Sequence, residues 1–228
     1  MLTPVEIDAL ALSLRVALWA MVCSLPIGIA LAWVLSRLTF PGKSLLDASL
    51  HLPLVLPPVV IGYLLLIGFG RNGVFGRWLY DVFGITVAFT WKGAALASAV
   101  MAFPLLVRTV RLSLDAVDKK LELAARTLGA GPWRVFFSVT LPLSIPGVVA
   151  GMVLAFARSL GEFGATITFV SNIPGETQTL PLALYTMTQM PYGEAAAMRL
   201  CFISIGIALL ALVAANWLEK RFTRALRD

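Results

Sequence analysis

Five stretches of this sequence are apolar over the length that a helix needs to cross a lipid bilayer, about 20 residues. They cover residues 12–35, 45–69, 87–107, 145–170 and 200–218. Hydrophobic residues make up 59% of the chain and charged residues 13%, which excludes a soluble globular domain and a disordered chain. We therefore expect an all-α polytopic membrane protein, a single transmembrane domain over residues 1–228 with five transmembrane helices.

Basic residues gather in three of the segments that connect or follow these apolar stretches. Most of the 18 Lys and Arg residues lie in residues 36–44, 108–144 and 219–228. Loops on the cytoplasmic side of a membrane carry the excess of Lys and Arg. We therefore expect an outside N-terminus, an inside C-terminus and a cytoplasmic loop at 108–144. The net charge of +6 follows from this topology and gives no reason to expect a nucleic-acid partner.

The second apolar stretch contains three prolines within a few residues, Pro53, Pro57 and Pro58. A proline inside a helix removes a backbone hydrogen bond and clashes with the preceding turn. Two interpretations stay open. The stretch is either a kinked structural helix or a broken helix that lines a transport pathway, as broken helices do in many transporters.

The loop at 108–144 has the pattern of a short, capped cytoplasmic helix. Asp118 precedes it as an N-cap, Gly129 supplies a left-handed stop, and Pro132 is placed to begin a further helix. An apolar stripe recurs at three- and four-residue spacing. Its members are Leu121, Ala124, Ala125 and Leu128. Small alanine side chains let another protein approach closely, so we expect a docking helix; a helix lying on lipid headgroups is the alternative.

This loop resembles the EAA loop of permease subunits in binding-protein-dependent ABC importers. In that motif, Glu-Ala-Ala is followed by Gly after three residues and later by Ile, one residue and Leu-Pro. Aligned on Gly129, the two alanines are Ala124 and Ala125, Val139 replaces Ile, and Leu141-Pro142 completes the pattern. The motif's glutamate position holds Leu123, and the acidic residue is one position earlier, at Glu122. One residue turns a helix by about 100°, so Glu122 does not take over the same contact.

The resemblance extends over nearly the whole chain, and other segments are similar to the molybdate and sulfate branch of that family. These segments are residues 40–44, 52–62, 159–165 and 175–182. The resemblance implies the type I importer permease fold in a bacterial cytoplasmic (inner) membrane, with a periplasmic N-terminus. It implies a homodimer, two ATP-binding cassette subunits that bind ATP–Mg, and a periplasmic molybdate-binding protein. It also implies that the loop couples to the ATPase, through Glu122, Ala124, Ala125, Leu128, Gly129 and Trp133.

The fourth apolar stretch contains two opposite charges, Arg158 and Glu162. Residues four apart share a helix face, and charges within a span are paired or face water. The pair is either structural or stands beside the route of the anion as part of a gate. Small and hydroxyl residues surround it, and hydroxyls can donate to an oxyanion without trapping it. The candidate pathway or gate residues are Pro57, Pro58, Arg158, Ser159, Gly161, Glu162, Gly164, Thr166 and Thr168.

The sequence gives no support for catalysis or for a bound cofactor on this chain. Gly42-Lys43-Ser44 resembles the end of a P-loop, but Arg37 stands where that loop needs its first glycine. No metal-ligand spacing or catalytic triad is present in the sequence. ATP-driven transport would therefore need its nucleotide sites on a partner chain. The remaining alternatives are a permease for tungstate or sulfate, an ion-gradient-driven secondary transporter and a non-transporting scaffold.

Overall fold

The computed structural model describes the backbone of residues 3–225 and the side chains of residues 3–214 and 217. All regular elements in this part are helical. In chain order they are α1 Pro4–Arg37, α2 Lys43–Val55, α3 Pro58–Phe69, α4 Val74–Phe83, α5 Trp91–Ala116, α6 Lys119–Thr127, α7 Pro132–Val135, the π-helical turn η1 Phe136–Thr140, α8 Leu141–Leu160, α9 Gly164–Val170, α10 Leu180–Gln189 and α11 Glu194–Ala225.

Within the described residues, four helical stretches are long and apolar enough to cross a membrane. They are Pro4–Arg37, Trp91–Ala116, Pro132–Leu160 and Glu194–Ala214. Helices α2 and α3 form a fifth crossing if they count as one span, although they meet at an angle of 113°. The all-α class is confirmed, and the five predicted stretches correspond to these five units. The second stretch is broken and not merely kinked, because Leu56 and Pro57 separate α2 from α3; whether it lines a transport pathway stays a prediction.

The end of the third span and the continuity of the fourth differ from the prediction. Helix α5 runs to Ala116, so Arg108 and Arg111 lie on a helix and not in a loop. The prediction ended this span at Val107, before Arg108, but Val110 and Leu114 continue the buried face of the helix for two more turns. The fourth stretch is not one helix: α8 ends at Leu160 and α9 begins at Gly164.

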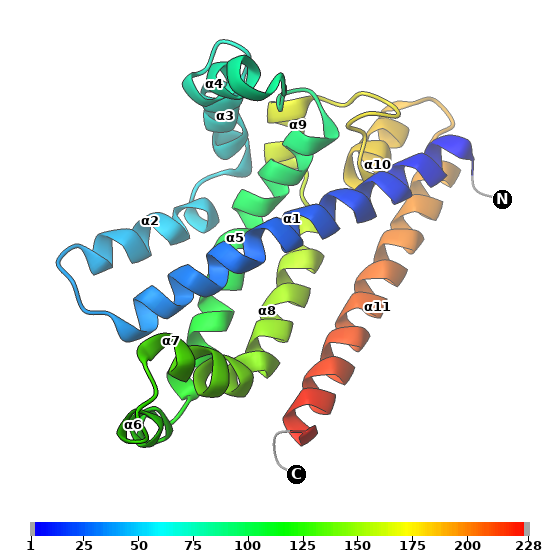
Figure 1. Ribbon diagram of the computed structural model, residues 1–228. Coiled ribbons are helices and arrows are strands. Elements are labelled where there is room, and N and C mark those ends of the chain that lie inside the picture. The colour runs from blue at the N-terminus through cyan, green and yellow to red at the C-terminus, as the bar shows by residue number, and fades with distance from the viewer. Residues whose placement is uncertain (1–2, 226–228) are drawn as a thin grey trace.

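Helix α5 forms the centre of the bundle and packs against α1, α8 and α9 (Figure 1). Small residues make this close packing possible, as in many membrane bundles. Toward one end, Ala94 and Ala97 of α5 are buried with Phe169 of α9. Toward the other end, the Leu106 side chain of α5 packs closely against Gly28 of α1 and Gly151 of α8, which leave room for it because they have no side chain.

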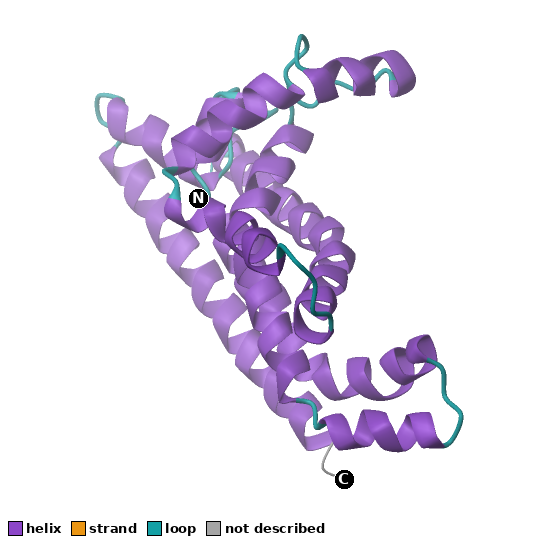
Figure 2. Cartoon of the chain, turned by 90° about the vertical axis from the view of Figure 1, so that its left-hand side faces the viewer, coloured by secondary structure: helices purple, strands orange, loops and turns teal. Residues whose placement is uncertain are grey.

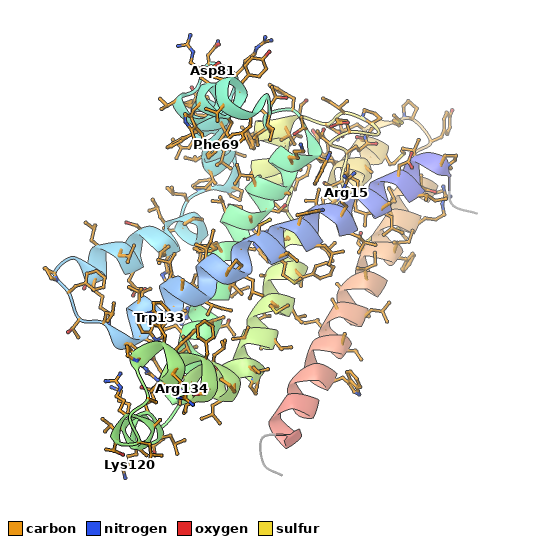
Figure 3. All side chains as sticks on the ribbon, in the orientation of Figure 1. Arg15, Phe69, Asp81, Lys120, Trp133 and Arg134 are labelled. Carbon is orange, nitrogen blue, oxygen red and sulfur yellow. The ribbon has the colours of Figure 1, made fainter. Side chains whose placement is uncertain are left out.

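The molecule has two different ends. Helices α4, α9 and α10 and the start of α1 lie at one end, and α6, α7 and the end of α11 lie at the other (Figure 1). The segment α6–α7 lies across the lower end of the long helices instead of continuing them (Figure 2). The labelled side chains of Asp81 and Lys120 mark these opposite ends (Figure 3). The predicted cytoplasmic loop is therefore a separate helical platform at one end of the bundle.

Candidate functional site: a docking helix and two broken spans

Helix α6 has the local structure that its sequence predicts. The Asp118 side chain caps the helix by accepting a hydrogen bond from the Lys120 backbone N–H at 2.9 Å. Gly129 adopts φ = +85°, a left-handed conformation that favours glycine. Pro132 then occupies the first turn of α7. A proline and a glycine thus fix the length of α6 and the direction in which the chain leaves it.

The end of α6 presents apolar side chains to the outside of the chain. Leu128 is 89% exposed and Trp133 is 68% exposed. Leu121, Leu123 and Ala124 are also exposed, whereas Ala125 is half-buried. An exposed apolar surface on a structured element is typical of an interaction site. Of the residues predicted to couple, Ala124, Leu128, Gly129 and Trp133 are accessible to a partner.

Glu122 points the other way, into its own chain. Its carboxylate accepts hydrogen bonds from Arg37 at 2.7 and 3.1 Å and from the Thr140 hydroxyl at 2.8 Å. Arg37 also donates to the backbone carbonyl of Leu114 at 2.8 Å. Glu122 is 8% exposed. The carboxylate therefore ties α6 to α1 and η1, and through Arg37 to α5, and is not part of the exposed surface; a role of Glu122 in coupling stays a prediction.

Aromatic side chains form a second connection between this platform and α1. The ring of Trp133 stacks on Trp33 with centroids 6.1 Å apart, and Trp33 meets Phe136 edge-on at 5.9 Å. Offset and edge-to-face pairs of this kind add roughly 0.5–1.5 kcal/mol each beyond burial. Both an ion pair and an aromatic stack therefore join this platform to the end of α1.

The two broken spans meet each other. A Cβ added to Gly164, the first residue of α9, would lie 2.8 Å from the Cβ of Pro58, the first residue of α3. A Cβ added to Gly62 would lie 2.5 Å from the carbonyl oxygen of Ala165 and 2.8 Å from the Cβ of Thr168. The breaks after α2 and after α8 thus lie side by side, and α3 and α9 are in close contact through these glycines.

Arg158 and Glu162 form the predicted ion pair at 2.7 Å. The pair bridges the break after α8, because Arg158 lies in the last turn of α8 and Glu162 lies between α8 and α9. The Glu162 carboxylate also accepts a hydrogen bond from the Ala165 backbone N–H at 2.9 Å. The Glu162 side chain is 1% exposed, whereas that of Arg158 is 31% exposed. One carboxylate therefore both neutralises Arg158 and caps the start of α9.

The hydroxyl residues near this break have different surroundings. The hydroxyl of Thr168 donates to the Gly164 carbonyl of its own helix at 2.9 Å. The hydroxyls of Ser159 and Thr166 are buried and have no hydrogen-bond partner in the described part of the chain. Unpaired buried hydroxyls are uncommon and costly. Gly161 has free space around its Cα. Whether an anion passes these residues stays a prediction.

The replacement Thr166→Val tests whether the unpaired hydroxyl is kept for transport. Valine has nearly the same shape, so removal of an unpaired buried hydroxyl should raise the free energy of unfolding by about 1 kcal/mol. Uptake of the anion should nevertheless fall several-fold. The measurements are thermal melting in detergent and uptake into vesicles. The matched control is Thr109→Val, whose hydroxyl already donates to Leu105. Normal uptake by Thr166→Val would exclude the hydroxyl from the route.

Sequence reasoning missed several residues that the tertiary structure brings together. The sequence gives Arg37 no structural role, yet it joins α1, α5 and α6. A polar cluster near α9 and α10 was also missed: Gln178 donates to Asn172 at 3.0 Å, and Asn172 donates to Thr186 at 2.8 Å. Only the run of polar residues at 171–179 gave a signal for this cluster.

Comparison with known proteins identifies the family. Residues 24–224 match the family described as "Binding-protein-dependent transport system inner membrane component". The chain belongs to this family. It is therefore a multi-pass inner-membrane permease of an ABC transporter, and its family members are transport components.

Similar permeases include proteins that are named for different substrates. The chain is 64% identical over 219 residues to the "Molybdenum transport system permease protein ModB" of Escherichia coli K12, with 96% of each chain covered. It is 61% identical over 221 residues to the protein of the same name from Haemophilus influenzae, covering 97% of this chain and 96% of the other. The "Sulfate transport system permease protein CysT" of Escherichia coli K12 is 42% identical over 197 residues, which cover 86% of this chain and 70% of that protein.

Solved structures confirm the permease fold at low sequence identity. A chain of a bacterial alginate ABC transporter in complex with an alginate-bound periplasmic protein matches with a TM-score of 0.76 and 17% identity, covering 97% of this chain and 80% of that one. A chain of the MetNI methionine ABC transporter in an inward-facing conformation matches with a TM-score of 0.68 and 16% identity. The match covers 95% of this chain and 94% of that one. The type I importer permease fold expected from the sequence is thereby confirmed.

Proposed function

We propose that this permease moves molybdate across the cytoplasmic membrane into the cell, driven by separate ATPase subunits. The observation that carries the proposal is the 64% identity, over 96% of both chains, to a molybdenum transport permease. Sulfate permeases are more distant, with 42% identity in the example above. Permeases for tungstate or sulfate remain the alternative, because these tetrahedral dianions resemble molybdate.

We propose that the working unit is a homodimer with two ATP-binding cassette subunits and a periplasmic molybdate-binding protein. ATP–Mg binds to the ATPase chains, and the exposed side of α6 docks on them. The chain alone leaves much of its apolar surface open: Val55 is 81% exposed and Tyr63 is 57% exposed. The broken spans α2–α3 and α8–α9 supply one wall of a route, and a second copy supplies the other wall.

The orientation follows from the charge distribution. The basic end, with α6, α7 and the end of α11, faces the cytoplasm, because cytoplasmic segments carry excess Lys and Arg. The start of α1, helix α4 and the segment 171–199 then face the periplasm, where the binding protein delivers the anion. ATP binding draws the two ATPases together, moves the α6 helices and opens the route outward; hydrolysis resets it. Coupling of this kind is reciprocal between the two sites.

The substrate is tested by copurifying the permease with its native ATPases and reconstituting the complex in lipid. The molybdate-loaded binding protein should stimulate ATP hydrolysis more strongly than the same protein loaded with sulfate. Stimulation only by a sulfate-loaded binding protein would replace molybdate with sulfate as substrate. Uptake by vesicles that contain the permease but no ATPase would instead favour an ion-gradient-driven transporter.

The docking role of α6 is tested by Gly129→Leu. In the described part of the chain, no atom lies within 4 Å of the position of an added Cβ at Gly129, so leucine has room to project toward the partner, although the left-handed φ of +85° strains any side chain there. We expect anion-stimulated ATP hydrolysis to fall at least ten-fold while the permease stays in the membrane. The control is Gly42→Leu, because Gly42 also has a left-handed φ of +87° and free space. Unchanged stimulation in Gly129→Leu would contradict the docking role.

A further inference from the structure

A charged cleft lies between α2 and α5, away from the breaks at residues 56–57 and 161–163. Its volume is about 570 Å³. Its lining contains Ser44, Asp47, Ala48 and His51 from α2 and Val107, Arg108, Arg111, Leu112 and Asp115 from α5. One water molecule occupies about 30 Å³, so the cleft has room for an ion together with part of its hydration shell.

The charges in the cleft are only partly paired. Arg111 donates to the Asp47 carboxylate at 3.0 Å and lies 3.7 Å from the Asp115 carboxylate. The Nδ1 of His51 lies 2.8 Å from the Asp47 backbone carbonyl, which can only accept, so this nitrogen carries the hydrogen. Arg108 is exposed and forms no ion pair with the residues that the structure describes. It is the unpaired cation of the lining, whose two arginines and two aspartates sum to zero formal charge.

Arg108 lies at a depth in the membrane where an unpaired charge needs contact with water. It precedes Ala116, the end of α5, by eight residues, or about 12 Å along the helix axis. A helix of 26 residues is about 39 Å long and exceeds the 30 Å hydrocarbon core by only a few ångströms at each end. An arginine in this position is costly in lipid and faces the bundle or a water-filled cavity. The opposite face of α5, at Leu106 and Val110, is fully buried.

We propose that the α2–α5 cleft is a water-filled inner vestibule that the tetrahedral oxyanion enters before its release to the cytoplasm, with Arg108 attracting it. This inference rests on the proposed function for the charge of the cargo. The cleft lies toward the α6 end of α5, which is the proposed cytoplasmic side. Asp47 and Asp115 together outweigh the charge of Arg111. The attraction for a dianion is therefore confined to the surroundings of Arg108, and it is too weak to delay release.

The experiment measures the electrostatic potential in the cleft by cysteine labelling. Cys23 and Cys201 are first replaced by serine, and Ala48→Cys then places a thiol in the lining; Ser44→Cys is the second position if the first complex does not assemble. The whole transporter in lipid nanodiscs is treated with a negatively charged and a positively charged methanethiosulfonate reagent. The ratio of the two labelling rates, relative to a free thiol, reports the local potential.

Arg108→Gln should lower the relative rate of the anionic reagent about three-fold, the effect of one unit charge a few ångströms away in water. Arg108→Lys should leave the relative labelling rate of the anionic reagent unchanged. The matched control is Lys92→Gln, which removes an exposed cation from the other end of α5, about 24 Å away along the helix and beyond the screening length. Millimolar molybdate, tungstate or sulfate should slow the anionic reagent more than sodium chloride of equal ionic strength.

Two results would overturn the proposal: absence of labelling at both cysteine positions in the folded complex, or a rate ratio that Arg108→Gln leaves unchanged. Lack of protection by all three oxyanions would equally exclude the vestibule as part of their route. These readings do not depend on which oxyanion is the cargo, because all three are used. If only the sulfate-loaded binding protein stimulates ATP hydrolysis, the proposed substrate fails while the labelling result still stands.

Discussion

Replacement of Arg37 by methionine is expected to separate ATP hydrolysis from transport. Arg37 is the hydrogen-bond partner of Glu122, and the two side chains are each only 11% exposed. Without the arginine, the Glu122 carboxylate stays buried without its charge partner, which costs about 3 kcal/mol or more. The contact between α6 and the ends of α1 and α5 should loosen. We expect anion-stimulated ATP hydrolysis and uptake to fall more than ten-fold, while basal hydrolysis by the ATPases continues.

Two further variants separate a mechanical role from a purely structural one. Arg37→Lys keeps the charge but cannot bond both Glu122 and the Leu114 carbonyl through a planar group, so an intermediate loss is expected. Arg37→Met with Glu122→Gln removes both charges and should recover thermal stability without recovering stimulation. Full stimulation in Arg37→Met, measured with the reconstituted transporter, would show that force reaches the bundle by another path.

Gly62→Ala should damage the permease more than the size of one methyl group suggests. The added Cβ would lie 2.5 Å from the Ala165 carbonyl oxygen and 2.8 Å from the Thr168 Cβ. Backbone atoms cannot move aside as a flexible side chain can, so α3 and α9 must separate. Overpacking of this kind costs about 1–3 kcal/mol. We expect a lower melting temperature in detergent and loss of most uptake, because the two broken spans no longer meet.

The matched control is Gly206→Ala, in the middle of α11. Among the residues that the structure describes, no atom lies within 4 Å of an added Cβ at Gly206. Alanine in a helix is more favourable than glycine by about 0.5–1 kcal/mol, so this variant should be neutral or slightly more stable. If Gly62→Ala melts at the same temperature as Gly206→Ala and transports normally, the close approach of α3 to α9 has no functional importance.

The proposed mechanism uses one mechanical connection. In this proposal the exposed side of α6 receives the movement of a partner, and the Arg37–Glu122 pair and the Trp33–Trp133 stack pass it to α1. Helix α1 in turn packs along α5 and α8. The bundle holds the paired breaks at Pro57 and at residues 161–163, where α3 meets α9. A rigid bundle between two sites is the element through which coupling can act.

The sequence by itself determined the membrane class, the number of crossing units and the position of α6. Each of these depends on local properties: the length of an apolar stretch, a cap at Asp118, and a left-handed stop at Gly129. The family also followed from a local motif, around Ala124, Ala125 and Gly129. Local signals of this kind hold in the folded chain because they act within a few residues of backbone.

Only the tertiary structure decided which side chains face each other. Glu122 and Arg37 are 85 positions apart, and no periodicity predicts that one arginine will reach α5 and α6 together. The extension of α5 past Arg108 and the break after Leu160 also depended on neighbours. Buried contacts stabilise the extended part of α5. The break after Leu160 is stabilised by the Glu162 carboxylate, which pairs with Arg158 and caps α9. Long-range contacts of this kind form when packing places distant segments together, so neither segment alone predicts which residues will be partners.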